Sequence, residues 1–497
     1  MRAVRVGVVS LLVVCSSLAM AAIASAAPGN YDRSFGEGGV AHVKSFESGY
    51  AEREGRLAVG PEGATYLLRC VGGCGSRTVV TRFLPDGKID RSYGDAGTAT
   101  ATTGIEGNSS EESALAVDPD GRVVVAAVLR QGLVLTRLNP DGSVDGTFSG
   151  GGVERRIECG CVGLHLAIDG AGRIVVDGRS TVTDNGESQY ALPSTSTLFF
   201  SRFLSDGRPD PGFGENGATI VTLEGVFTPQ SSIVQSDGGI VIAGSKRLHG
   251  IWPFALRIEP NGSFQRLYGA ALMKGPLNAR LKATGATALI ARPNGVRVLG
   301  ETESGGGYVL ALGAQGKVSH SFGEGGFRLL PWKVTSAAGD RQGRIVGVGT
   351  QSLSHHVTAF RLLANGAPDR TFAGGRGVLL MQISEMESAA SEQVVIPPNQ
   401  RPTFLVSTVD FCRFQCGADQ TLFRLRGGDA DARCRGQVAT VVGTVADDRL
   451  VGTPRRDVIV GLSGADVVYG RGGNDLICGG PGQDQLHGGP GRDHVYQ

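Results

Sequence analysis

The sequence predicts an all-β chain, in which a seven-bladed β-propeller is followed by a C-terminal parallel β-roll. Two observations predict the propeller: one phrase recurs every 50 to 65 residues, and a hairpin turn with a β-branched strand recurs between its copies. Six consecutive nonapeptides with glycine and aspartate at fixed positions predict the roll. The expected divisions are a signal peptide at 1–26, the propeller at 28–430 and the roll at 434–497.

The first residues have the order of a secretory signal peptide. Arg2 and Arg5 form a positive n-region, and an apolar run follows to about Ile23. Ala24-Ser25-Ala26 then provides an A-x-A cleavage pattern. An uncleaved N-terminal anchor is the alternative, because the apolar run borders on the length that spans a bilayer. We expect a secreted protein that is extracellular or associated with the cell surface.

Charge and composition narrow the class of protein. The formal net charge is +1, and it becomes −1 once Arg2 and Arg5 are removed, so the chain lacks the basic surface that nucleic acids require. The 78 glycines follow no Gly-X-Y period, which excludes collagen, and 41% hydrophobic residues argue against disorder. No later segment is long and apolar enough to cross a membrane, so we expect no transmembrane segment in the mature chain.

Eight cysteines follow the signal peptide, an even number in an oxidising compartment. Zinc is the alternative, although C-x3-C and C-x-C spacings differ from the usual C-x2-C. We expect local disulfides within the two C-x3-C pairs, where each would pinch a loop, and a disulfide between the two isolated cysteines. The pairing of the C-x-C cysteines stays open. The groups are Cys70 with Cys74, Cys159 with Cys161, Cys412 with Cys416, and the isolated Cys434 and Cys478.

The recurring phrase has an arginine, an Asp-Gly turn, a second aspartate and an aromatic residue followed by glycine. It is clearest at 82–94, 137–148 and 202–214, and degraded copies begin at Arg257, Ala311 and Arg361. Between copies lies a Gly turn followed by a β-branched strand, as in Gly121-Arg122-Val123-Val124-Val125. Asp-Gly between strand-like runs is a strong hairpin signal, so each period holds about four short strands.

The two ends of the repeat region each carry half of the phrase. The second half stands alone at 32–36, and the first half stands alone at 424–428. A unit of four short strands cannot bury its faces by itself, so such units stack radially as propeller blades. A ring closes if the N-terminal strand completes the last blade, which gives seven blades, with six or eight as alternatives.

The phrase resembles the delta-60 repeat family of bacterial β-propellers over about four-fifths of the chain. The match is specific in the blades that carry Tyr93, Phe148 and Phe213, and loose in those that carry Tyr268 and Phe322. The resemblance implies a fold and an exported protein, but it brings no catalytic residues. The repeated Asp90, Asp145, Asp210 and Asp369 are predicted to cap tight turns, with a cation bound to the blade as the alternative.

The tail from Gly443 divides into six nonapeptides without a gap. Position one is always glycine, position six is always aspartate, and position eight is always aliphatic. The aliphatic residue is expected to face inward from a three-residue strand, and aspartates 18 residues apart are expected to stack at about 4.8 Å. The two ladders are Asp448, Asp466 and Asp484, and Asp457, Asp475 and Asp493.

Stacked carboxylates repel one another unless a cation lies between them. A hard cation that takes carboxylate and carbonyl oxygens compensates that repulsion, and Ca²⁺ fits best. Glycine permits the left-handed turn angles and exposes carbonyl oxygens. A solenoid cap whose aspartates only close turns is the alternative.

The tail resembles the RTX, or haemolysin-type, calcium-binding repeat. The last four nonapeptides match well, whereas Ala446 and Arg455 replace the glycine at position four in the first two. The resemblance implies calcium ligands at the six aspartates, with Asp448 and Asp457 as the weaker members, and at the glycines of positions one and four. Those glycines are Gly461, Gly464, Gly470, Gly473, Gly479, Gly482, Gly488 and Gly491.

The sequence contains no recognised catalytic constellation. It lacks HExxH, G-x-S-x-G and a P-loop, and its eight histidines are scattered. His355-His356 is predicted to be a polar pair rather than a metal site. We expect a secreted calcium-binding protein with a non-enzymatic propeller for an extracellular ligand, a glycan or a protein. The alternative is a secreted polysaccharide hydrolase or lyase with its site in the propeller channel.

Overall fold

The computed structural model describes most of the chain beyond its first residues. The described residues are 32, 34–37, 39–43, 55–71, 77–103, 112–129, 132–150, 153–155, 161–180, 195–248, 250–265, 268–269, 276–350, 356–372, 377–382, 387–397, 401–410, 418–425, 433–439, 441–442, 449–452, 456–461, 465–480 and 482–497. The signal peptide, Cys74, Cys159, Cys412, Cys416 and His355 lie outside them. No helix in this part of the chain is both long and apolar enough to span a bilayer.

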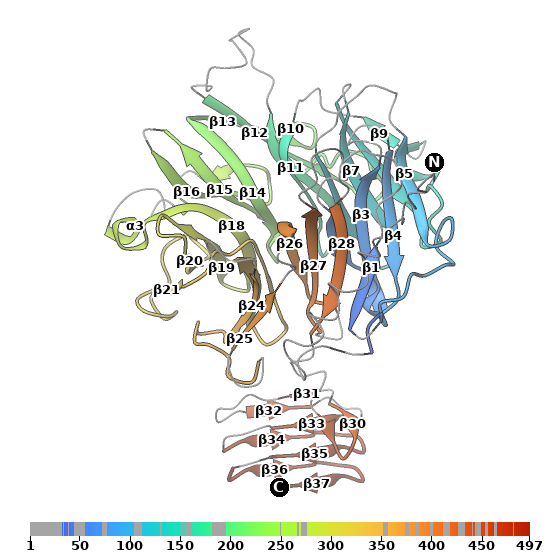
Figure 1. Cartoon of the computed structure of the whole chain (residues 1–497), viewed down its shortest axis with the longest axis vertical. Coiled ribbons are helices and arrows are strands. Elements are labelled where there is room, and N and C mark those ends of the chain that lie inside the picture. The colour runs from blue at the N-terminus through green and yellow to red at the C-terminus, as the bar shows by residue number, and fades with distance from the viewer. Residues whose placement is uncertain are drawn as a thin grey trace, which may run out of the picture.

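Seven four-stranded antiparallel sheets form the blades of a propeller (Figure 1). The innermost strands of consecutive blades contact one another in a closed ring. Blade 1 contains β2 (Arg56–Val59), β3 (Thr65–Val71), β4 (Arg77–Phe83) and β5 (Thr98–Thr103). Blade 2 contains β6 (Ser113–Val117), β7 (Val123–Leu129), β8 (Gly132–Leu138) and β9 (Val153–Arg155). Blade 3 contains β10 (Cys161–Ile168), β11 (Ile174–Ser180), β12 (Thr195–Phe203) and β13 (Ala218–Glu224).

Blade 4 contains β14 (Val226–Val234), β15 (Ile240–Arg247), β16 (Ile251–Ile258) and β17 (Phe264–Gln265). The short helix α3 (Pro276–Leu281) then leads to blade 5, with β18 (Ala283–Arg292), β19 (Gly295–Thr302), β20 (Gly307–Gly313) and β21 (Phe327–Leu330). Blade 6 contains β22 (Ser336–Gly339), β23 (Ile345–Thr350), β24 (His356–Leu362) and β25 (Val378–Gln382). Blade 7 contains β26 (Glu387–Val395), β27 (Thr403–Asp410), β28 (Ala418–Arg424) and the N-terminal β1 (Val40–Val43).

The two ends of the repeat region close the ring. Strand β1 pairs antiparallel with β28, with Val40 opposite Phe423, and Figure 1 shows the blue β1 beside the orange β28. The predicted seven-bladed propeller, completed by the N-terminal strand, is therefore confirmed. A closed ring leaves no long unpaired sheet edge between its first and last blades.

A buried ion pair occupies the same place in five blades. The arginine at the start of the phrase donates from Nε to Oδ2 of the second aspartate at 2.6–2.8 Å, and its guanidinium lies 4.6–5.0 Å from the centre of the aromatic ring. We call this arrangement the clamp. The pairs are Arg82–Asp90, Arg137–Asp145, Arg202–Asp210, Arg361–Asp369 and, across the ring closure, Arg424–Asp32.

The clamp also joins each blade to the next. Arg202 in blade 3 donates from Nη1 to the Pro260 carbonyl of blade 4 at 2.7 Å, and Arg424 reaches the Pro85 carbonyl of blade 1 in the same way. Only glycine fits in the contacted turn: at Gly87, with φ +83°, a Cβ atom would lie 2.7 Å from the Phe35 ring. The recurring Asp-Gly is therefore required by blade packing as well as by the turn itself.

The second aspartates also cap turns, as predicted. Oδ1 of Asp90 accepts a hydrogen bond from the backbone N–H of Ser92 at 3.0 Å, and Asp145, Asp210 and Asp369 do the same two residues on. The opposing arginine was not anticipated. Because each of these carboxylates already has an arginine partner, the alternative of a cation bound to the blade gains no support.

The last part of the chain forms the predicted parallel β-roll. The hairpin of β29 (Arg433–Cys434) and β30 (Gln437–Val438) precedes two parallel sheets. One sheet contains β31 (Val441–Val442), β33 (Val458–Val460), β35 (Leu476–Cys478) and β37 (His494–Tyr496). The other contains β32 (Arg449–Val451), β34 (Val467–Tyr469) and β36 (Gln485–His487). Figure 1 shows the strands stacked beneath the propeller.

The interior of the roll is made by the position-eight side chains. Ile459, Val468 and Ile477 are fully buried and form one cluster, with Leu450 and Leu486 packed against it. Val495 in the last coil is 42% exposed, because no further coil covers it among the described residues.

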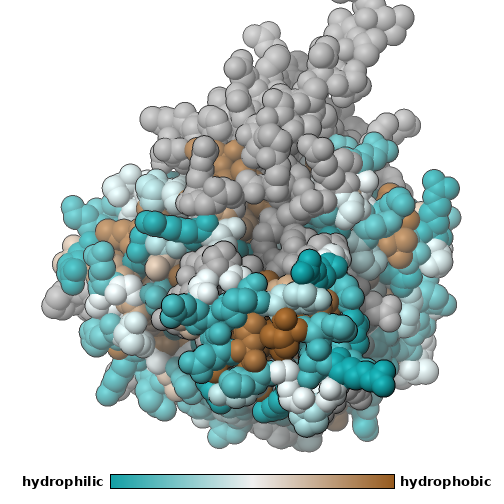
Figure 2. Space-filling model, turned by 90° about the horizontal axis from the view of Figure 1, so that it is seen from below, coloured by the Kyte–Doolittle hydropathy of each residue, from teal (hydrophilic) through white to brown (hydrophobic). Residues whose placement is uncertain are grey.

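The described surface seen from below is mostly hydrophilic, with small separate hydrophobic patches (Figure 2).

The ring closure gives a prediction for Asp32→Asn. Burial favours a raised pKa of the Asp32 carboxyl, but the hydrogen bond from Ser34 and the charges of Arg424 and Arg401 outweigh it and lower the pKa to about 2. The carboxylate therefore contributes stability above its ordinary pKa of 3.8, and this contribution is lost as pH falls through about 2. Loss of one partner of a buried pair costs about 3–5 kcal/mol, which urea unfolding at pH 7 measures.

Asp86→Asn provides the matched control, because Asp86 pairs with Lys88 on the surface and should cost under about 1 kcal/mol. The stability difference between Asp32→Asn and the parent should shrink from pH 4 toward pH 2. An equal effect of both variants at pH 7 would contradict the role of the clamp in closing the ring.

Candidate functional site

The roll brings its aspartates into two ladders. The parallel strands pair in register at intervals of one full coil, so Val467 lies opposite Gln485 and Leu476 opposite His494. Each aspartate N–H then donates to Oδ1 of the aspartate 18 residues later. These hydrogen bonds run from Asp457 to Asp475 at 2.8 Å, from Asp466 to Asp484 at 3.0 Å, and from Asp475 to Asp493 at 2.9 Å.

Asp475 lies at the centre of one ladder and is fully buried. Its Oδ1 accepts the Asp457 N–H, whereas its Oδ2 has no hydrogen-bond donor in the part of the chain that the structure describes. Burial raises the pKa of the Asp475 carboxyl, the Asp457 hydrogen bond opposes that rise, and the charges of Asp493 and Asp457 add to it. A buried carboxylate oxygen without a partner is costly unless something positive approaches it.

Glycines make room for oxygens around this carboxylate. A Cβ atom on Gly470 would lie 2.4 Å from Asp475 Oδ2 and 2.4 Å from the carbonyl oxygen of Gly488. Gly461 is placed in the same way between Asp466 Oδ2 and the carbonyl of Gly479, at 2.3 and 2.4 Å. Carboxylate and carbonyl oxygens of adjacent coils therefore converge. Such a set of hard oxygen donors fits Ca²⁺ and no soft metal.

The glycines at position four have the turn geometry that the pattern predicts. Gly473, Gly482 and Gly491 have φ of +117°, +154° and +153°. At Gly491 a Cβ atom would lie 1.5 Å from the Gly473 carbonyl oxygen, so no side chain is tolerated there. Asp448 and Gly464 lie outside the described residues, and the other predicted ligands are present on the ladders or in the turns between them. Their role as ligands stays a prediction.

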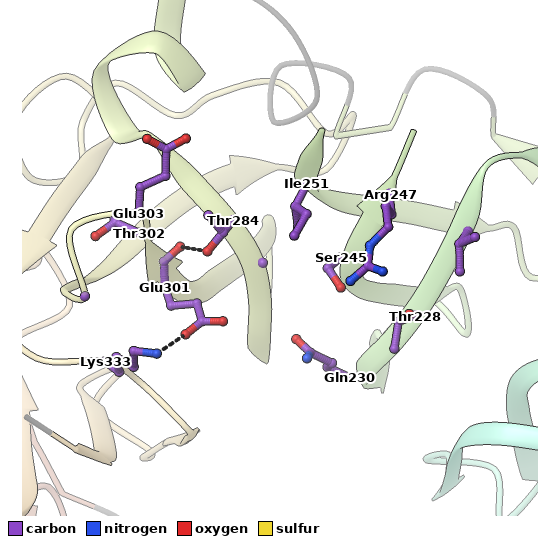
Figure 3. Close-up of a pocket in the computed structure, with 13 residues that line it drawn as sticks. Thr228, Gln230, Ser245, Arg247, Ile251, Thr284, Glu301, Thr302, Glu303 and Lys333 are labelled. Carbon is purple, nitrogen blue, oxygen red and sulfur yellow. Dashed lines mark hydrogen bonds and ion pairs between the residues drawn. The ribbon is translucent and has the colours of Figure 1, made fainter. Parts of the chain in front are cut away.

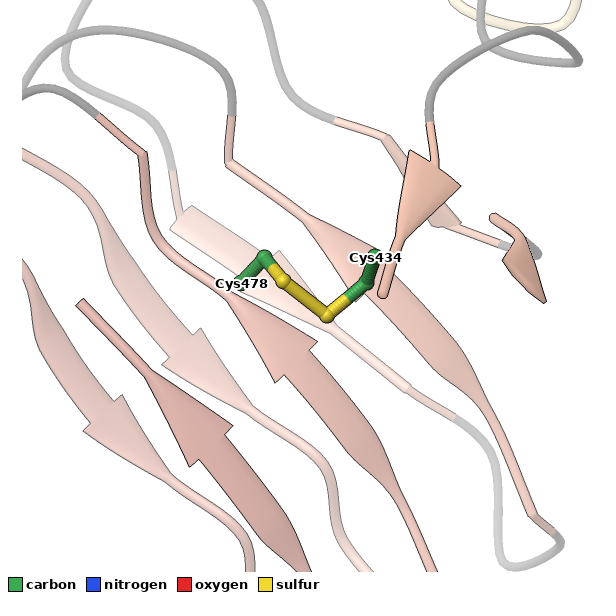
Figure 4. The surroundings of a disulfide bond; sticks show 2 residues. All are labelled: Cys434 and Cys478. Carbon is green, nitrogen blue, oxygen red and sulfur yellow. A yellow bond between two sulfur atoms is a disulfide. The ribbon is translucent and has the colours of Figure 1, made fainter. Parts of the chain in front are cut away.

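The β29–β30 hairpin is fixed to the roll by a disulfide. Cys434 is fully buried against Val458, Val460 and Leu476, and it bonds to Cys478 on β35 (Figure 4). The predicted link between the start of the tail and the fourth nonapeptide is confirmed. The predicted Cys70–Cys74 and Cys412–Cys416 bonds involve residues outside the described part of the chain.

The propeller channel forms a second candidate site, with a cavity of about 680 Å³ that is lined mostly by the innermost strands. Several of its polar side chains connect one blade to the next. The connections include Leu57 N–H to Gln393 Oε1 at 2.7 Å, Val394 N–H to Ser336 Oγ at 3.2 Å, Leu289 N–H to Ser231 Oγ at 3.0 Å, and Thr287 Oγ1 to the Val334 carbonyl at 2.6 Å. These groups serve as inter-blade contacts, which reduces the number free to meet a ligand.

One histidine in the channel was missed by the sequence analysis. His165 on β10 lies opposite Asp177 on β11, with Nδ1 3.2 Å from Oδ1, and Ser232 of the next blade donates to Asp177 Oδ2 at 2.6 Å. Asp177 is only 2% exposed. A carboxylate held in this way orients the imidazole so that Nε2 is its second functional nitrogen. No motif signals the pair, because a β-bulge between Val162 and His165 sets the register.

The geometry defines a β-propeller followed by a C-terminal parallel β-roll. Family models agree: residues 442–477 and 479–496 match the RTX calcium-binding nonapeptide repeat (4 copies). Residues 119–148 match a domain of unknown function, the DUF5122 beta-propeller. The resemblances to calcium-binding RTX repeats and to a repeat propeller are thereby confirmed. No curated protein matches the chain.

Solved structures share only the general fold. The NanB sialidase from Streptococcus pneumoniae is similar at 11% identity and TM-score 0.40, covering 78% of this chain and 70% of its own. The subtype N11 neuraminidase-like protein of A/flat-faced bat/Peru/033/2010 is similar at 10% identity and TM-score 0.38, covering 78% and 94%. Kuenenia stuttgartiensis hydrazine synthase is similar at 11% identity and TM-score 0.39, covering 61% and 82%.

The raised pKa of Asp475 predicts opposite pH responses with and without calcium. A carboxyl whose pKa is raised by folding stabilises the fold below its ordinary value of 3.8, and that contribution is lost as pH rises through the folded pKa. In chelator, amide exchange of residues 466–497, corrected for intrinsic rates, should be slower at pH 4 than at pH 7. In calcium the order should reverse, because binding requires the carboxylate.

Asp475→Asn should flatten the pH response in chelator and reduce the protection that calcium brings. Asp120→Asn, which changes a 71% exposed carboxylate in blade 2, should leave both unchanged. The same pH response in Asp475→Asn as in the parent would exclude Asp475 as its origin.

The disulfide predicts a weaker calcium response in Cys434→Ser. The bond closes a loop with a sequence separation of 44, for which chain entropy alone gives a stabilisation of about 4 kcal/mol. We expect the calcium midpoint for protection of the roll to move to higher concentration. The double variant Cys434→Ser/Cys478→Ser should behave alike, which controls for a reactive thiol. An unchanged calcium titration in both variants would show that the disulfide does not support calcium-induced folding of the roll.

Proposed function

We propose that this is a secreted protein whose roll folds on Ca²⁺ and whose propeller is a non-enzymatic binding module for an extracellular ligand. The observation that carries the calcium role is the buried Asp475, whose Oδ2 faces the Gly488 carbonyl where only glycine leaves room. The signal-peptide pattern of the first residues and the Cys434–Cys478 disulfide support export.

The proposed ligands of Ca²⁺ come from neighbouring coils. The carboxylates of Asp466, Asp475, Asp484 and Asp493 carry the site, with Asp457 and Asp448 as weaker members. Carbonyl oxygens from the glycines that flank these aspartates complete the donor set. The bound ion supplies the positive charge that lets stacked carboxylates remain ionised inside the folded roll.

The binding role of the propeller is supported by the use of its polar groups. Five clamps and several inner-ring hydrogen bonds engage charged and polar side chains of the repeat in contacts within and between blades. The loops and strand ends are the parts of a propeller that commonly bind a ligand.

A polysaccharide hydrolase or lyase is the second candidate, and the His165–Asp177 pair is the observation that favours it. An imidazole oriented by a buried carboxylate is a common general base. Glu112 lines the same cavity, but its Oε2 lies 3.5 Å from the Leu164 N–H, where it bridges two blades. Within the described lining, the channel thus offers one oriented base and a glutamate that is engaged between blades.

Calcium binding and ligand binding are tested on the full mature chain. Equilibrium dialysis should show bound Ca²⁺ that EGTA removes, together with loss of amide protection in the roll. A glycan and extracellular-protein array probed in calcium should show retention without turnover. Cleavage products that disappear in His165→Ala would instead establish the enzyme, and absence of calcium binding would refute the role of the roll.

A further inference from the structure

A polar cavity of about 520 Å³ lies between blades 4 and 5 and opens onto the channel (Figure 3). Thr228 and Gln230 line both this cavity and the channel. We call it the side pocket. Thr228, Gln230, Ser245, Arg247 and Ile251 come from blade 4 and form one wall, and residues of blade 5 with Lys333 form the other. Its volume lies in the range of small-molecule sites.

The blade 4 wall differs from the rest of the channel in having uncommitted polar groups. Within the described part of the chain, the side chains of Thr228, Gln230, Ser245 and Arg247 form no hydrogen bond or ion pair. In other blades, polar groups on the inner strands such as Ser336 and Gln393 are bonded to the next blade. Uncommitted donors that face a cavity are available to a ligand without the loss of an internal contact.

Two β-bulges place polar residues on opposite sides of the side pocket. The pairing of β14 with β15 shifts register between Pro229 and Ser231, which makes Gln230 the extra residue. The pairing of β18 with β19 shifts between Ala283 and Gly285, which makes Thr284 the extra residue. Bulges re-aim side chains and are common beside binding sites. Both extra residues line the pocket.

The two walls of the side pocket carry different charged groups. On the blade 5 side, Lys333 Nζ pairs with Glu301 Oε2 at 3.1 Å, and Glu303 lies nearby (Figure 3). Among the described residues that line the pocket, Arg247 on the other wall is a cation without an ion-pair partner. A guanidinium binds a carboxylate with two parallel hydrogen bonds. The ionised glutamates can only accept hydrogen bonds, and hydroxyl groups of a ligand can donate them.

We propose that the side pocket binds a uronate, a sugar unit that carries a carboxylate, from an extracellular polysaccharide. Arg247 holds the carboxylate, Gln230 and Ser245 meet ring hydroxyls, and Glu301 and Glu303 accept from the hydroxyls of the opposite face. Val226 and Ile251 are the apolar side chains of the lining, so the pocket lacks the apolar anchors that a peptide needs. This assignment rests on the proposed binding function and names its site and ligand class.

The test compares acidic and neutral saccharides that differ in one group. Isothermal titration of the full chain in calcium uses galacturonate, glucuronate and mannuronate trisaccharides, each with the neutral hexose trisaccharide of the same linkage. At least one uronate should bind about tenfold or more tightly than its neutral counterpart, because a charged bidentate contact contributes at least that factor. Arg247→Ala should abolish the difference.

Arg208→Ala is the matched control, since it removes an exposed arginine of blade 3 that pairs with Asp206. It should leave uronate affinity unchanged, whereas Gln230→Ala should weaken the uronate and neutral sugars alike. Equal affinity for uronate and neutral sugars, or an unchanged preference in Arg247→Ala, overturns the assignment. Binding of a glutamate-rich peptide that Arg247→Ala abolishes, with no uronate binding, overturns it in favour of a peptide site.

The experiments distinguish failure of the uronate assignment from failure of the proposed binding function. If the array finds a ligand whose affinity is insensitive to Arg247→Ala, the propeller remains a binding module and the side pocket is excluded as its site. If neither the array nor the uronates show binding while cleavage products appear, both the binding function and the uronate assignment fall.

Discussion

The ion pair between the arginine that opens the phrase and the aspartate eight residues later recurs in four blades, and it is the contact on which the propeller depends. The arginine satisfies the carboxylate, lies over the aromatic ring and reaches a carbonyl of the next blade, so one side chain joins turn, core and neighbour. A buried charge that lost its partner would be unfavourable, which makes each clamp specific for its own geometry. Where the phrase is split, Arg424 and Asp32 form the same pair across the ring closure.

The roll depends on an opposite electrostatic condition. Burial, together with the charges of Asp493 and Asp457, raises the pKa of Asp475. The pKa of Asp32 is instead lowered, because its hydrogen bond from Ser34 and the charges of Arg424 and Arg401 outweigh its burial. The clamps of the propeller thus carry their own counter-charges in the sequence, whereas the roll matches a calcium-binding repeat whose counter-charge comes from solution. Under the proposed function, folding of the roll follows the calcium concentration of its surroundings.

The proposed ligand sites use other side chains than the clamps. Several repeated side chains are engaged in blade-to-blade contacts. The bulge at Gln230 belongs to a recurring feature, because the inner strands of blades 3, 4, 5 and 7 all shift register against their neighbours. Blade 5 has a second shift at Thr284, and blade 4 contributes Arg247 to the pocket. In blade 3 the shift precedes His165, which lies opposite Asp177. The bulge is thus shared among blades, whereas the side chains beside it differ.

The sequence by itself determined those features that recur at a regular spacing along the chain. The spacing of the aromatic phrase determined the blades and their number, the split phrase determined the closure, and the nonapeptide register determined which aspartates stack, because each depends on distances along the chain. Only the tertiary structure decided which residues of neighbouring blades contact one another. Arg82 and Asp90 are visible in the phrase, but their contact with Pro140 of the next blade requires the ring. The side pocket brings Arg247 and Glu301 to one cavity through packing of two blades, and the spacing along the chain shows neither that packing nor the register shifts at Gln230 and Thr284.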